Sequence, residues 1–321
     1  MAQNKTNQEA SIFKTYYTDV PFVDRYERDK AKAVDVIIPI IHTNELWEIN
    51  LKSMYREIPI NRILIADGGC IDNSLEIVKK FPRVEIHDHK AFKSLGYSIR
   101  KLVESVKTDW FIYVHSDVFL PEGWFDEMAK HQPEYDWFGC RMRHTIMVEY
   151  DDKNDFRPYA GSQMGKKEAF LEGLKSIDDD YVYRQEDFVF SEMIERSGYK
   201  EGKIDDTFHY HQTMFRKTKG FDLDINKVVF DINKKPEEEY RASIMQIKGT
   251  IKYLKPEKRI AAFIVIDFVK LSRLGRLNWS EIKDHINATN PGWMKFYGYW
   301  KTRIAYDKVI SFLGNLKRRC I

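Results

Sequence analysis

The chain has 321 residues, of which 43% are hydrophobic and 31% are charged, so it can bury a sizeable core and wholesale disorder is not expected. Its three cysteines are far apart and form no CxxC pair, which excludes a disulfide framework and favours a reducing compartment, the cytoplasm. The tempting apolar run at residues 260–266 is too short for a bilayer-spanning helix, which needs ~20 residues. By its length, the chain is expected to hold about two domains, or one catalytic domain with an appendage.

The segment from residue 34 to residue 114 alternates between strand and helix patterns. Residues 34–40, VDVIIPI, form a continuous run rich in β-branched side chains, which is typical of a strand covered on both faces. Strands that alternate with helices predict βαβ units, and hence an α/β fold with a mostly parallel, Rossmann-like sheet. Three further strands are predicted at residues 62–67, 83–88 and 110–114, and helices at residues 44–58, 72–81 and 98–107.

The pattern changes in the second half of the chain. Residues 136–150 are strand-like, residues 151–162 form a predicted loop, and residues 185–198 form an amphipathic helix that Gly198 can end. Helical patterns rich in Lys, Trp and Tyr follow residue 219. We therefore divide the chain into an N-terminal arm, residues 1–33, a catalytic domain, residues 34–220, and a helical extension, residues 221–321.

The C-terminal extension is strongly basic. Residues 251–321 contain 15 Lys/Arg and 5 Asp/Glu, a net charge of +10 in a chain whose total is +3. Such a segment predicts an anionic partner, and the interleaved Trp, Phe and Tyr favour peripheral association with a membrane surface. Nucleic acid is not expected, because no recognised binding module is present. The alternative is that the apolar stripes pack on the catalytic domain and the basic face is only solvated.

Acidic side chains stand at the ends of several predicted elements. Asp67 ends the second strand, and Asp117 follows the fourth strand in the segment FIYVHSD. Glu186 and Asp187 open the helix that begins in QEDFVF. Open α/β sheets bind their ligands at the carboxyl ends of their strands, so these acids are candidate ligand-binding and catalytic groups. Helix capping and ordinary strand-end polarity are the structural alternatives.

Two histidines follow the predicted helix in the segment DTFHYHQTMF. His209 and His211 alternate along the sequence, so on a strand both would face the same side. Carboxylates, an imidazole and the phosphates of a substrate together suit a divalent ion such as Mn²⁺ or Mg²⁺. A separate carboxylate can take the proton from an incoming hydroxyl. The residues therefore indicate a metal-assisted transfer site.

Six segments, taken in order, resemble family-2 glycosyltransferases with the GT-A fold. The resemblance covers about residues 34–215, and the order of the segments is more specific than any one of them. It implies an inverting enzyme that moves a sugar from a nucleoside diphosphate donor, with UDP favoured over GDP, to a hydroxyl of a glycan or lipid-linked glycan. The segments are VDVIIPIIHTNELWEINLKSM, ILIADGGCIDNSLEIV, SLGYSIRKLV, DWFIYVHSDVFLPEGWFDEM, AGSQMGKKEAF and QEDFVFSEMIERSGYKEGKIDDTFHYH.

The resemblance implies a set of donor-binding residues. Asp67 matches the acid that hydrogen-bonds the nucleotide base in this family. The chain that follows the first strand resembles the segment against the base and ribose, and a turn with a nearby arginine resembles the segment beneath the ribose and phosphates. The other residues expected to contact the donor are Pro39, Ile41, Asn44, Gly96, Arg100 and Ser116.

The resemblance also implies the metal ligands and the catalytic base. Asp117 matches the last acid of the Asp-x-Asp metal motif of the family. His211 stands where the family often has a histidine that binds the metal or the diphosphate, and His209 is the second candidate. Asp187 matches the catalytic base of the Glu-Asp motif, and Glu186 matches the acid that helps to hold the acceptor.

Two positions depart from the family pattern. The first acid of the Asp-x-Asp motif is His115 here, and the usual Asp-Asp-Gly-Ser reads Ala66-Asp67-Gly68-Gly69. His115 could bind a softer divalent metal, or it could bond a hydroxyl of the sugar or ribose. Alternatively, metal dependence is weakened and cationic side chains carry more of the diphosphate charge. We expect dependence on Mn²⁺ or Mg²⁺ and count His115 among the candidate ligands.

Two other functions stay open at the level of the sequence. A nucleotidyltransferase on a related sheet would place a Gly-rich loop with Lys or Arg after the first strand, where this chain has PIIHTNEL. A non-catalytic protein with the same fold could serve as a scaffold at a membrane. The sequence names neither the sugar, nor the acceptor, nor the oligomeric state.

Overall fold

The computed structural model describes residues 20–43, 46–70, 72–144, 159–179, 182, 186–211, 247–249, 251–254 and 279–296. The chain divides into two compact units. The first unit comprises residues 1–179 and 193–234, and the second comprises residues 180–192 and 235–321. The predicted domain boundary near residue 220 lies outside the described residues.

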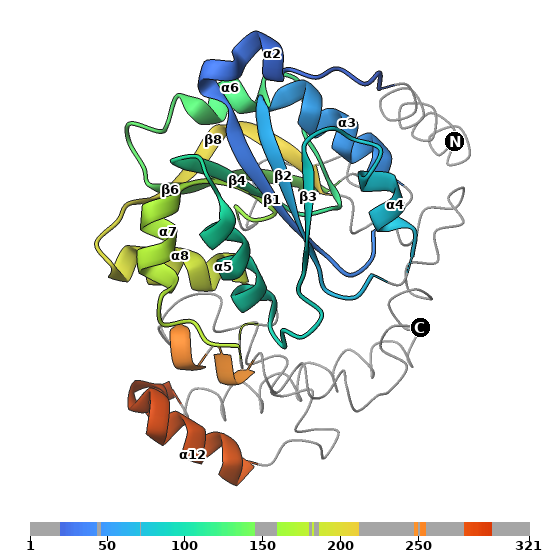
Figure 1. Cartoon of the computed structure of the whole chain (residues 1–321). Helices are drawn as coiled ribbons and strands as arrows, with labels where there is room; N and C mark the ends of the chain where they lie inside the picture. Colours follow the sequence, from blue (N-terminus) through green and yellow to red (C-terminus); the bar gives the residue numbers. More distant parts are fainter. Residues whose placement is uncertain are drawn as a thin grey trace, which may run out of the picture. The chain divides into compact units, whose positions relative to one another are not determined.

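The first unit is built on one mixed sheet of eight strands (Figure 1). The strands lie in the order β3-β2-β1-β4-β7-β6-β8-β5. The four neighbouring strands β3, β2, β1 and β4 run parallel, and the strands beyond β4 include both antiparallel and parallel pairs. The strands are β1 (Val34–Ile40), β2 (Ile60–Asp67), β3 (Val84–Asp88), β4 (Trp110–Val114), β5 (Val118–Phe119), β6 (Trp137–His144), β7 (Ser162–Lys166) and β8 (Glu201–His211).

The parallel strands place their carboxyl ends at one edge of the sheet. β1 lies between β2 and β4, and Ile40 is the register partner of Asp67. Strand β7 runs antiparallel to β4, so that Val114 faces Ser162. Strand β8 runs parallel to β6 and pairs with the short β5 at the outer edge, where Val118 faces His211. The end of β8 thereby lies beside the chain that has just left β4.

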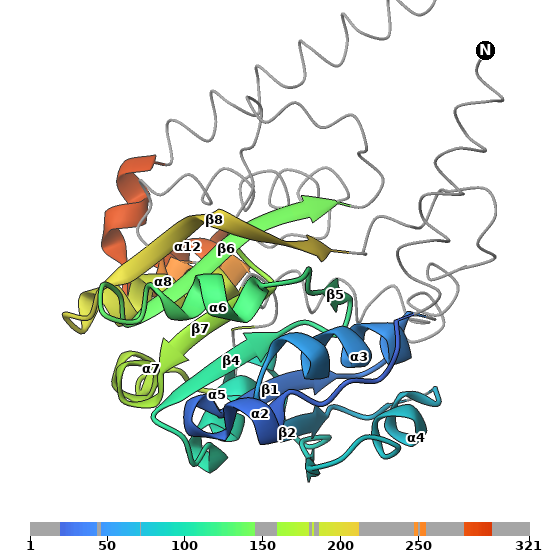
Figure 2. The same cartoon turned by 90° about the horizontal axis from the view of Figure 1, so that it is seen from above.

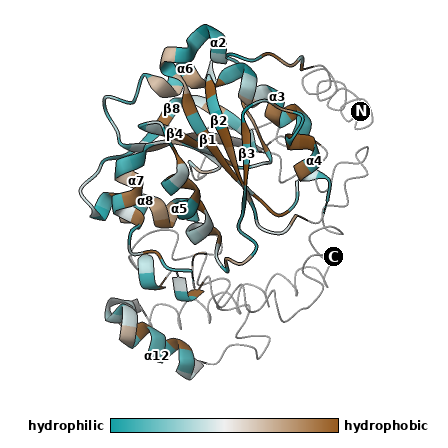
Figure 3. Ribbon diagram, in the orientation of Figure 1, coloured by the Kyte–Doolittle hydropathy of each residue, from teal (hydrophilic) through white to brown (hydrophobic). Residues whose placement is uncertain are grey.

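Helices cover both faces of this sheet (Figures 1 and 2). Helices α3 (Trp47–Glu57), α4 (Ser74–Val78) and α6 (Trp124–Ala129) lie on one face, and α5 (Leu95–Ser105) and α7 (Lys167–Leu174) lie on the other. Alternation along β1 directs Val36 and Ile38 into the core beneath α3. Figure 3 shows the hydrophobic residues concentrated in the central strands, as expected for strands covered on both faces.

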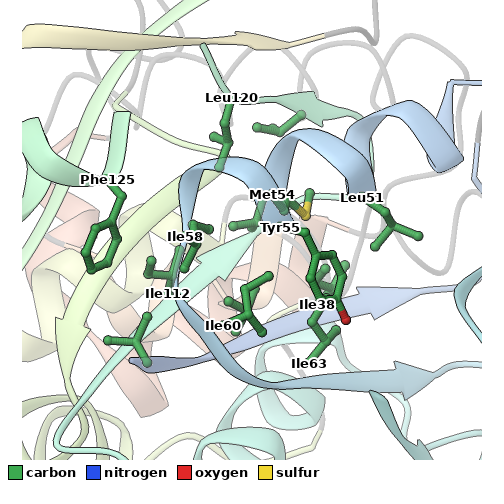
Figure 4. Packing of buried hydrophobic residues seen from close by; sticks show 14 of the residues in the cluster. Ile38, Leu51, Met54, Tyr55, Ile58, Ile60, Ile63, Ile112, Leu120 and Phe125 are labelled. Carbon is green, nitrogen blue, oxygen red and sulfur yellow. The ribbon is translucent and has the colours of Figure 1, made fainter. Parts of the chain in front are cut away.

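The main core lies between the sheet and α3 (Figure 4). Met54 and Tyr55 of α3 are fully buried against Ile38, Ile63 and Ile112 of the strands. On the opposite face an edge-to-face contact between Phe111 and Phe170, with ring centroids 5.3 Å apart, joins β4 to α7. Complete burial of a side chain of this size contributes about 1.5–3 kcal/mol, so the parallel strands form a rigid base for the loops at their ends.

The strands predicted at residues 34–40, 62–67, 83–88 and 110–114 are confirmed, with ends that differ by at most two residues. The helices predicted around α3, α4 and α5 are confirmed as well. The turn predicted at Gly96 is wrong, because Gly96 lies in the first turn of α5, which the Ser94 hydroxyl caps by accepting from the Tyr97 amide. The short strand β7 begins in the predicted loop, since its sequence SQMGK lacks the β-branched residues that indicate a strand.

Residues 20–33 pack on the rest of the first unit. They contain α2 (Tyr26–Asp29) and a 3₁₀ turn, η1 (Lys30–Lys32). The buried Arg25 donates to the Glu57 carbonyl at 2.7 Å and pairs with Asp126 of α6 at 2.6 Å. Phe22 contacts Tyr55 with ring centroids 5.5 Å apart. These contacts fix the chain that enters β1.

In the second unit, α12 (Trp279–Thr289) and η4 (Pro291–Phe296) pack on residues 247–249 and 251–254. The fully buried Trp293 donates its indole N–H to the Leu254 carbonyl at 3.0 Å. Helix α8 (Glu186–Arg196) contains the boundary between the two units. Among the helices of the described segments, none is long and apolar enough to pass through a lipid bilayer.

A buried carboxylate supports the amino-terminal ends of the parallel strands. Asp35 of β1 is fully buried and accepts from Arg62 at 2.5 Å, from Asn61 at 2.8 Å and from the Lys107 amide at 2.6 Å. The same Arg62 guanidinium also pairs at 2.9 Å with Glu85, which is exposed. One cation thus has a buried and an exposed partner.

We predict that Asp35→Asn lowers the free energy of unfolding by about 3 kcal/mol, because it removes the buried partner of Arg62. The matched control Glu85→Gln removes the exposed partner of the same cation and should cost less than about 1 kcal/mol. Urea denaturation of both variants measures the difference. Equal losses would contradict a buried charge network at this place.

Candidate metal and nucleotide site

Asp67 ends β2 at the carboxyl edge of the sheet and shapes the loop that follows. Its Oδ1 accepts from the backbone amides of Gly69 at 2.9 Å and Cys70 at 2.8 Å. Its Oδ2 lies 3.0 Å from the Lys90 ammonium, which is 56% exposed. The Gly68 amide donates to the Ile40 carbonyl, so the loop stays joined to β1. One oxygen of the Asp67 carboxylate is therefore bound by the loop backbone, and the other faces an exposed cation.

The surroundings of Asp67 keep it ionised. Burial acts to raise the pKa of the carboxyl, but the amides of Cys70 and Gly69 and the Lys90 ammonium outweigh it and hold the pKa at about 2. Burial and the neighbouring Asp67 raise the pKa of the Cys70 thiol to about 12. Asp67 is therefore an acceptor-only group at neutral pH, and the thiol beside it is not a nucleophile.

Two histidines and an aspartate converge where β4 and β8 end and β5 begins. His211 Nε2 lies 3.5 Å from His115 Nδ1 and 3.6 Å from Asp117 Oδ1. One ligand atom from each of these three residues lies within 4.8 Å of the others. We call this group the His₂Asp cluster. His211 is buried, whereas His115 and Asp117 are partly exposed, so the cluster can be reached from solvent.

The backbone after β4 brings these side chains together. The His115 amide donates to the Gly161 carbonyl at 2.9 Å, which extends the pairing of β4 with β7 by one step. The Val118 amide then donates to the His115 carbonyl, forming a turn with Asp117 at its end. Because Val118 pairs with His211 in β5 and β8, the turn carries Asp117 back to the end of β8.

Buried polar groups hold this turn and its rings. Asn50 of α3 donates to the Ser116 carbonyl at 2.9 Å. The fully buried Tyr113 has its hydroxyl 2.9 Å from His115 Nε2, so the other ring nitrogen, Nδ1, is the one near His211. Burial lowers the pKa of His211, which keeps its imidazole neutral and able to bind a cation.

His209 lies one alternation before His211 on β8, on the same side of the strand. Its ring is fully buried, and its Nδ1 is 2.8 Å from the Ser162 hydroxyl. Cys140 lies behind both, with its sulfur 3.4 Å from Ser162 Oγ and in contact with the Trp124 indole at 3.2 Å. The histidine predicted as the second metal candidate is thus placed behind the His₂Asp cluster, in a network that supports β8.

The other sequence-predicted residues lie in several places. Pro39 is in β1, and Ile41 follows it with a 40% exposed side chain. Arg100 of α5 donates to the carbonyls of Lys175 and Ile177, beyond α7, at 2.9 and 2.8 Å. Its guanidinium therefore joins α5 to the segment that follows α7. Asn44 lies outside the described residues.

Glu186 and Asp187 occupy the first turn of α8, in the second unit, and both are buried. A helix N-terminus stabilises negative charge, so this position suits an ionised carboxylate. Burial of two adjacent acids is unusual, because Asp and Glu side chains are mostly exposed in folded proteins.

Four supporting residues are missed by sequence reasoning. Gly161, Tyr113, Ser162 and Asn50 shape the cluster or the network behind it through the contacts given above. Tyr113 and Ser162 look like ordinary strand residues in the sequence. Asn50 gives one signal, because it is a polar residue on the apolar face of a predicted helix. Gly161 stands in a segment with loop composition, so its importance follows only from the structure.

Residues 35–187 match the family described as glycosyl transferase family 2. The matched segment contains Asp67, His115 and Asp117, and it ends on Asp187. These residues form a glycosyltransferase family 2 domain. No curated protein matches the chain at a significant level.

Solved structures of other proteins resemble this chain at low sequence identity. A mannosyltransferase from Pyrobaculum calidifontis, in complex with GDP-Man and Mn²⁺, is 14% identical, with a TM-score of 0.51 over 88% of this chain and 75% of that chain. S. aureus TarS with UDP-GlcNAc is 12% identical, with a TM-score of 0.45 over 82% of this chain and 92% of that chain. Bifunctional IspDF from Campylobacter jejuni is 12% identical, with a TM-score of 0.39 over 61% of this chain and 54% of that chain, about half its length. The likeness to the mannosyltransferase, together with the family match, shows that this domain has the GT-A fold.

Gly161 is the position where a side chain would disturb the cluster most. It has φ of +88°, and a Cβ there would lie 2.9 Å from His211 Cδ2 and 3.3 Å from His209 Nε2. Gly198, after α8, has the same φ of +88° with nothing within 4 Å of such a Cβ. Substitution of either glycine would strain the backbone to the same extent, but only a side chain at Gly161 would collide with the histidines.

We predict that Gly161→Ala displaces His211 and weakens Mn²⁺ binding by about tenfold or more, the size of effect seen when metal ligands lose their orientation. Gly198→Ala should cost only the strain of a left-handed residue, about 1–2 kcal/mol, and leave Mn²⁺ affinity unchanged. Calorimetric Mn²⁺ titration and thermal unfolding of both variants test this. Unchanged Mn²⁺ affinity in Gly161→Ala would contradict the role of the glycine.

Proposed function

We propose that this protein is an inverting glycosyltransferase that transfers a sugar from a nucleoside diphosphate donor to a hydroxyl acceptor. The observation that carries the proposal is the His₂Asp cluster at the end of β4 and β8, in a family-2 domain whose neighbouring strand β2 ends on an ionised Asp67. β2 and β4 both lie next to β1 and run parallel to it. A cation site and a base-recognition acid therefore occupy the same edge, where a nucleoside diphosphate can reach both.

The residues present fit a divalent ion. His115, Asp117 and His211 would hold it, because imidazole nitrogen and carboxylate oxygen are accepted ligands of Mn²⁺ and the group leaves other positions open. Such an ion stabilises the negative charge that develops on the leaving diphosphate. Tyr113 and Gly161 keep the two imidazoles in place for it. His209 serves as a support of β8 in this proposal.

Asp67 recognises the nucleotide base by accepting a hydrogen bond. The ionised carboxylate has its Oδ1 occupied by two backbone amides, while its Oδ2 meets only the exposed Lys90 among the contacts above. A base N–H can take the place of this ammonium, and Lys90 can then turn to the diphosphate. Uracil and guanine both offer such an N–H, and we favour UDP. The chain around Pro39, Ile41 and Ser116 would line the same donor.

Asp187 acts as the base in the transfer step. It takes the proton of the acceptor hydroxyl, whose oxygen attacks the anomeric carbon while the bond from that carbon to the diphosphate oxygen breaks. Attack from the face opposite the leaving group inverts the anomeric centre. The support for this role is the match of Asp187 to the end of the family segment and its burial in the first turn of α8. Glu186 helps to hold the acceptor.

The acceptor is a glycan or a lipid-linked glycan in this proposal, and the protein works in the cytoplasm on a membrane surface. The support is the net charge of +10 over residues 251–321 together with their aromatic residues. Most of these residues lie outside the described part of the chain, so association with the membrane stays a prediction from the sequence.

A donor-binding experiment tests the proposed function. We predict that UDP or GDP raises the unfolding temperature only when Mn²⁺ is present, since a ligand at roughly 100 times its Kd stabilises a protein by about 2.7 kcal/mol. Asp117→Asn should lose this Mn²⁺-dependent shift. Donor hydrolysis or transfer in the same mixture excludes a scaffold. Absence of any shift with either nucleotide would contradict the proposal.

We predict that Asp187→Asn keeps the nucleotide-dependent thermal shift and lowers sugar transfer by at least about 100-fold, the usual contribution of a general base. The control is Glu168→Gln, which removes an exposed acid from the first turn of α7 and so tests the loss of a helix-end charge alone. Glu168→Gln should transfer sugar like the parent. Full activity in Asp187→Asn would show that another group accepts the proton.

A further inference from the structure

His115 differs from the family pattern in a way that the structure makes specific. It stands where an Asp-x-Asp motif has its first carboxylate, and it faces the cluster through Nδ1, 3.5 Å from His211 Nε2. The rings of His115 and His211 have centroids 5.7 Å apart at an interplanar angle of 71°. The cluster therefore offers two imidazole nitrogens and one carboxylate, where the motif would offer an additional carboxylate in place of one imidazole.

The buried hydroxyl of Tyr113 sets the orientation of the His115 ring. Its Nε2 is 2.9 Å from the hydroxyl of Tyr113, two residues earlier on the same face of β4. Tyr113 is fully buried, so it cannot turn away into solvent. When Nε2–H donates to the tyrosine oxygen, the lone pair of the imidazole lies on Nδ1, toward His211. A histidine that binds a metal commonly has its second nitrogen fixed in this way by a neighbouring acceptor.

The backbone keeps His115 from leaving this position. Its amide donates to Gly161 and its carbonyl accepts from Val118, so both sides of the residue are bound. Asn50 fixes the next carbonyl, that of Ser116. The backbone on both sides of His115 is therefore fixed, which limits the positions that its ring can take.

Ligand type decides which ions such a group prefers. Mg²⁺ and Ca²⁺ take hard oxygen ligands, and Mg²⁺ keeps several of its waters. Imidazole nitrogen suits transition metals such as Fe²⁺, Ni²⁺ and Zn²⁺ best, and Mn²⁺, the weakest binder of the first-row series, still accepts it more readily than Mg²⁺ does. On the proposed function, we propose that His115, oriented by Tyr113, makes this site selective for transition-metal ions over Mg²⁺. His115 is the specificity-determining ligand, and Tyr113 is a positioning residue.

The test is direct metal binding by the full chain. Calorimetry with MnCl₂ and with MgCl₂, alone and with saturating UDP or GDP, gives the ratio of the two dissociation constants. The parent should bind Mn²⁺ at least about tenfold more tightly than Mg²⁺. His115→Asp should reduce this ratio by about tenfold and gain Mg²⁺ affinity. The control His87→Asp, which changes a histidine on β3 outside the cluster, should leave the ratio unchanged.

Spectroscopy separates ligation from a structural role. With Mn²⁺ bound, pulsed electron paramagnetic resonance should detect nitrogen from two imidazoles in the parent and from one in His115→Asp. Tyr113→Phe should weaken Mn²⁺ binding by about 10–100-fold without improving Mg²⁺ binding, because it loosens the ring but adds no oxygen ligand. His115→Asn, a neutral variant of similar size, replaces His115→Asp if the latter does not fold.

The outcomes distinguish this inference from the proposed function. Equal affinity for Mn²⁺ and Mg²⁺ in the parent, or two imidazole nitrogens in His115→Asp, overturns the selectivity while a metal-dependent transferase stands. Tight nucleotide binding without any divalent ion in the parent overturns the metal role and the selectivity together, and leaves the transferase to be judged by sugar transfer.

Discussion

The hydrogen bond from the His115 amide to the Gly161 carbonyl is the contact on which the rest of the site depends. It holds the chain just after β4 against the chain just before β7, so the turn that carries Asp117 starts from a fixed point. Strand β5 then pairs with β8 and brings His211 to the same place. Since Gly161 also lies against both rings of β8, one residue sets the distance between the turn and the histidines.

The sheet explains why the two sites that we propose, one for a nucleotide base and one for a cation, share one edge. Parallel strands end together, so the carboxylate after β2 and the cluster after β4 lie on either side of β1. The two acids have different surroundings. Asp67 is tied to backbone amides and a lysine, which keep it ionised and suit it to a hydrogen-bond donor. Asp117 is placed beside imidazoles, which suits it to a cation. The different surroundings of Asp67 and Asp117 therefore suit the two carboxylates to different ligands.

The part of the fold that local patterns encode was predictable from the sequence. Strands β1, β2 and β4 are short apolar runs bounded by polar residues, and burial on both faces leaves such runs little alternative. β7 was not predictable, because its residues Ser162 and Gly165 have low strand propensity and only its pairing between β4 and β6 makes it a strand. The first turn of α5, which contains Gly96, was missed for a similar reason, since glycine indicates a turn unless a cap such as Ser94 precedes it.

The sequence predicted those candidate site residues that belong to recognisable motifs. Asp67, Asp117 and His211 were found from strand ends and from the resemblance to a family, and the structure shows Asp117 and His211 together with His115. Tyr113 is near them in the sequence but ordinary in type, and Gly161 is distant, so no local signal marks either residue. A match to a motif does not by itself define the contacts of a residue. Arg100 stands at a position that resembles a phosphate-contacting segment, and in this structure its guanidinium donates to the carbonyls of Lys175 and Ile177.

Anomalous diffraction at the manganese edge, from crystals of the full chain grown with Mn²⁺ and UDP or GDP, tests the central claim most directly. The account predicts one strong peak bound by His115, Asp117 and His211, with the diphosphate on the ion and the base beside Asp67. A peak elsewhere, or a nucleotide bound away from this edge of the sheet, would contradict it.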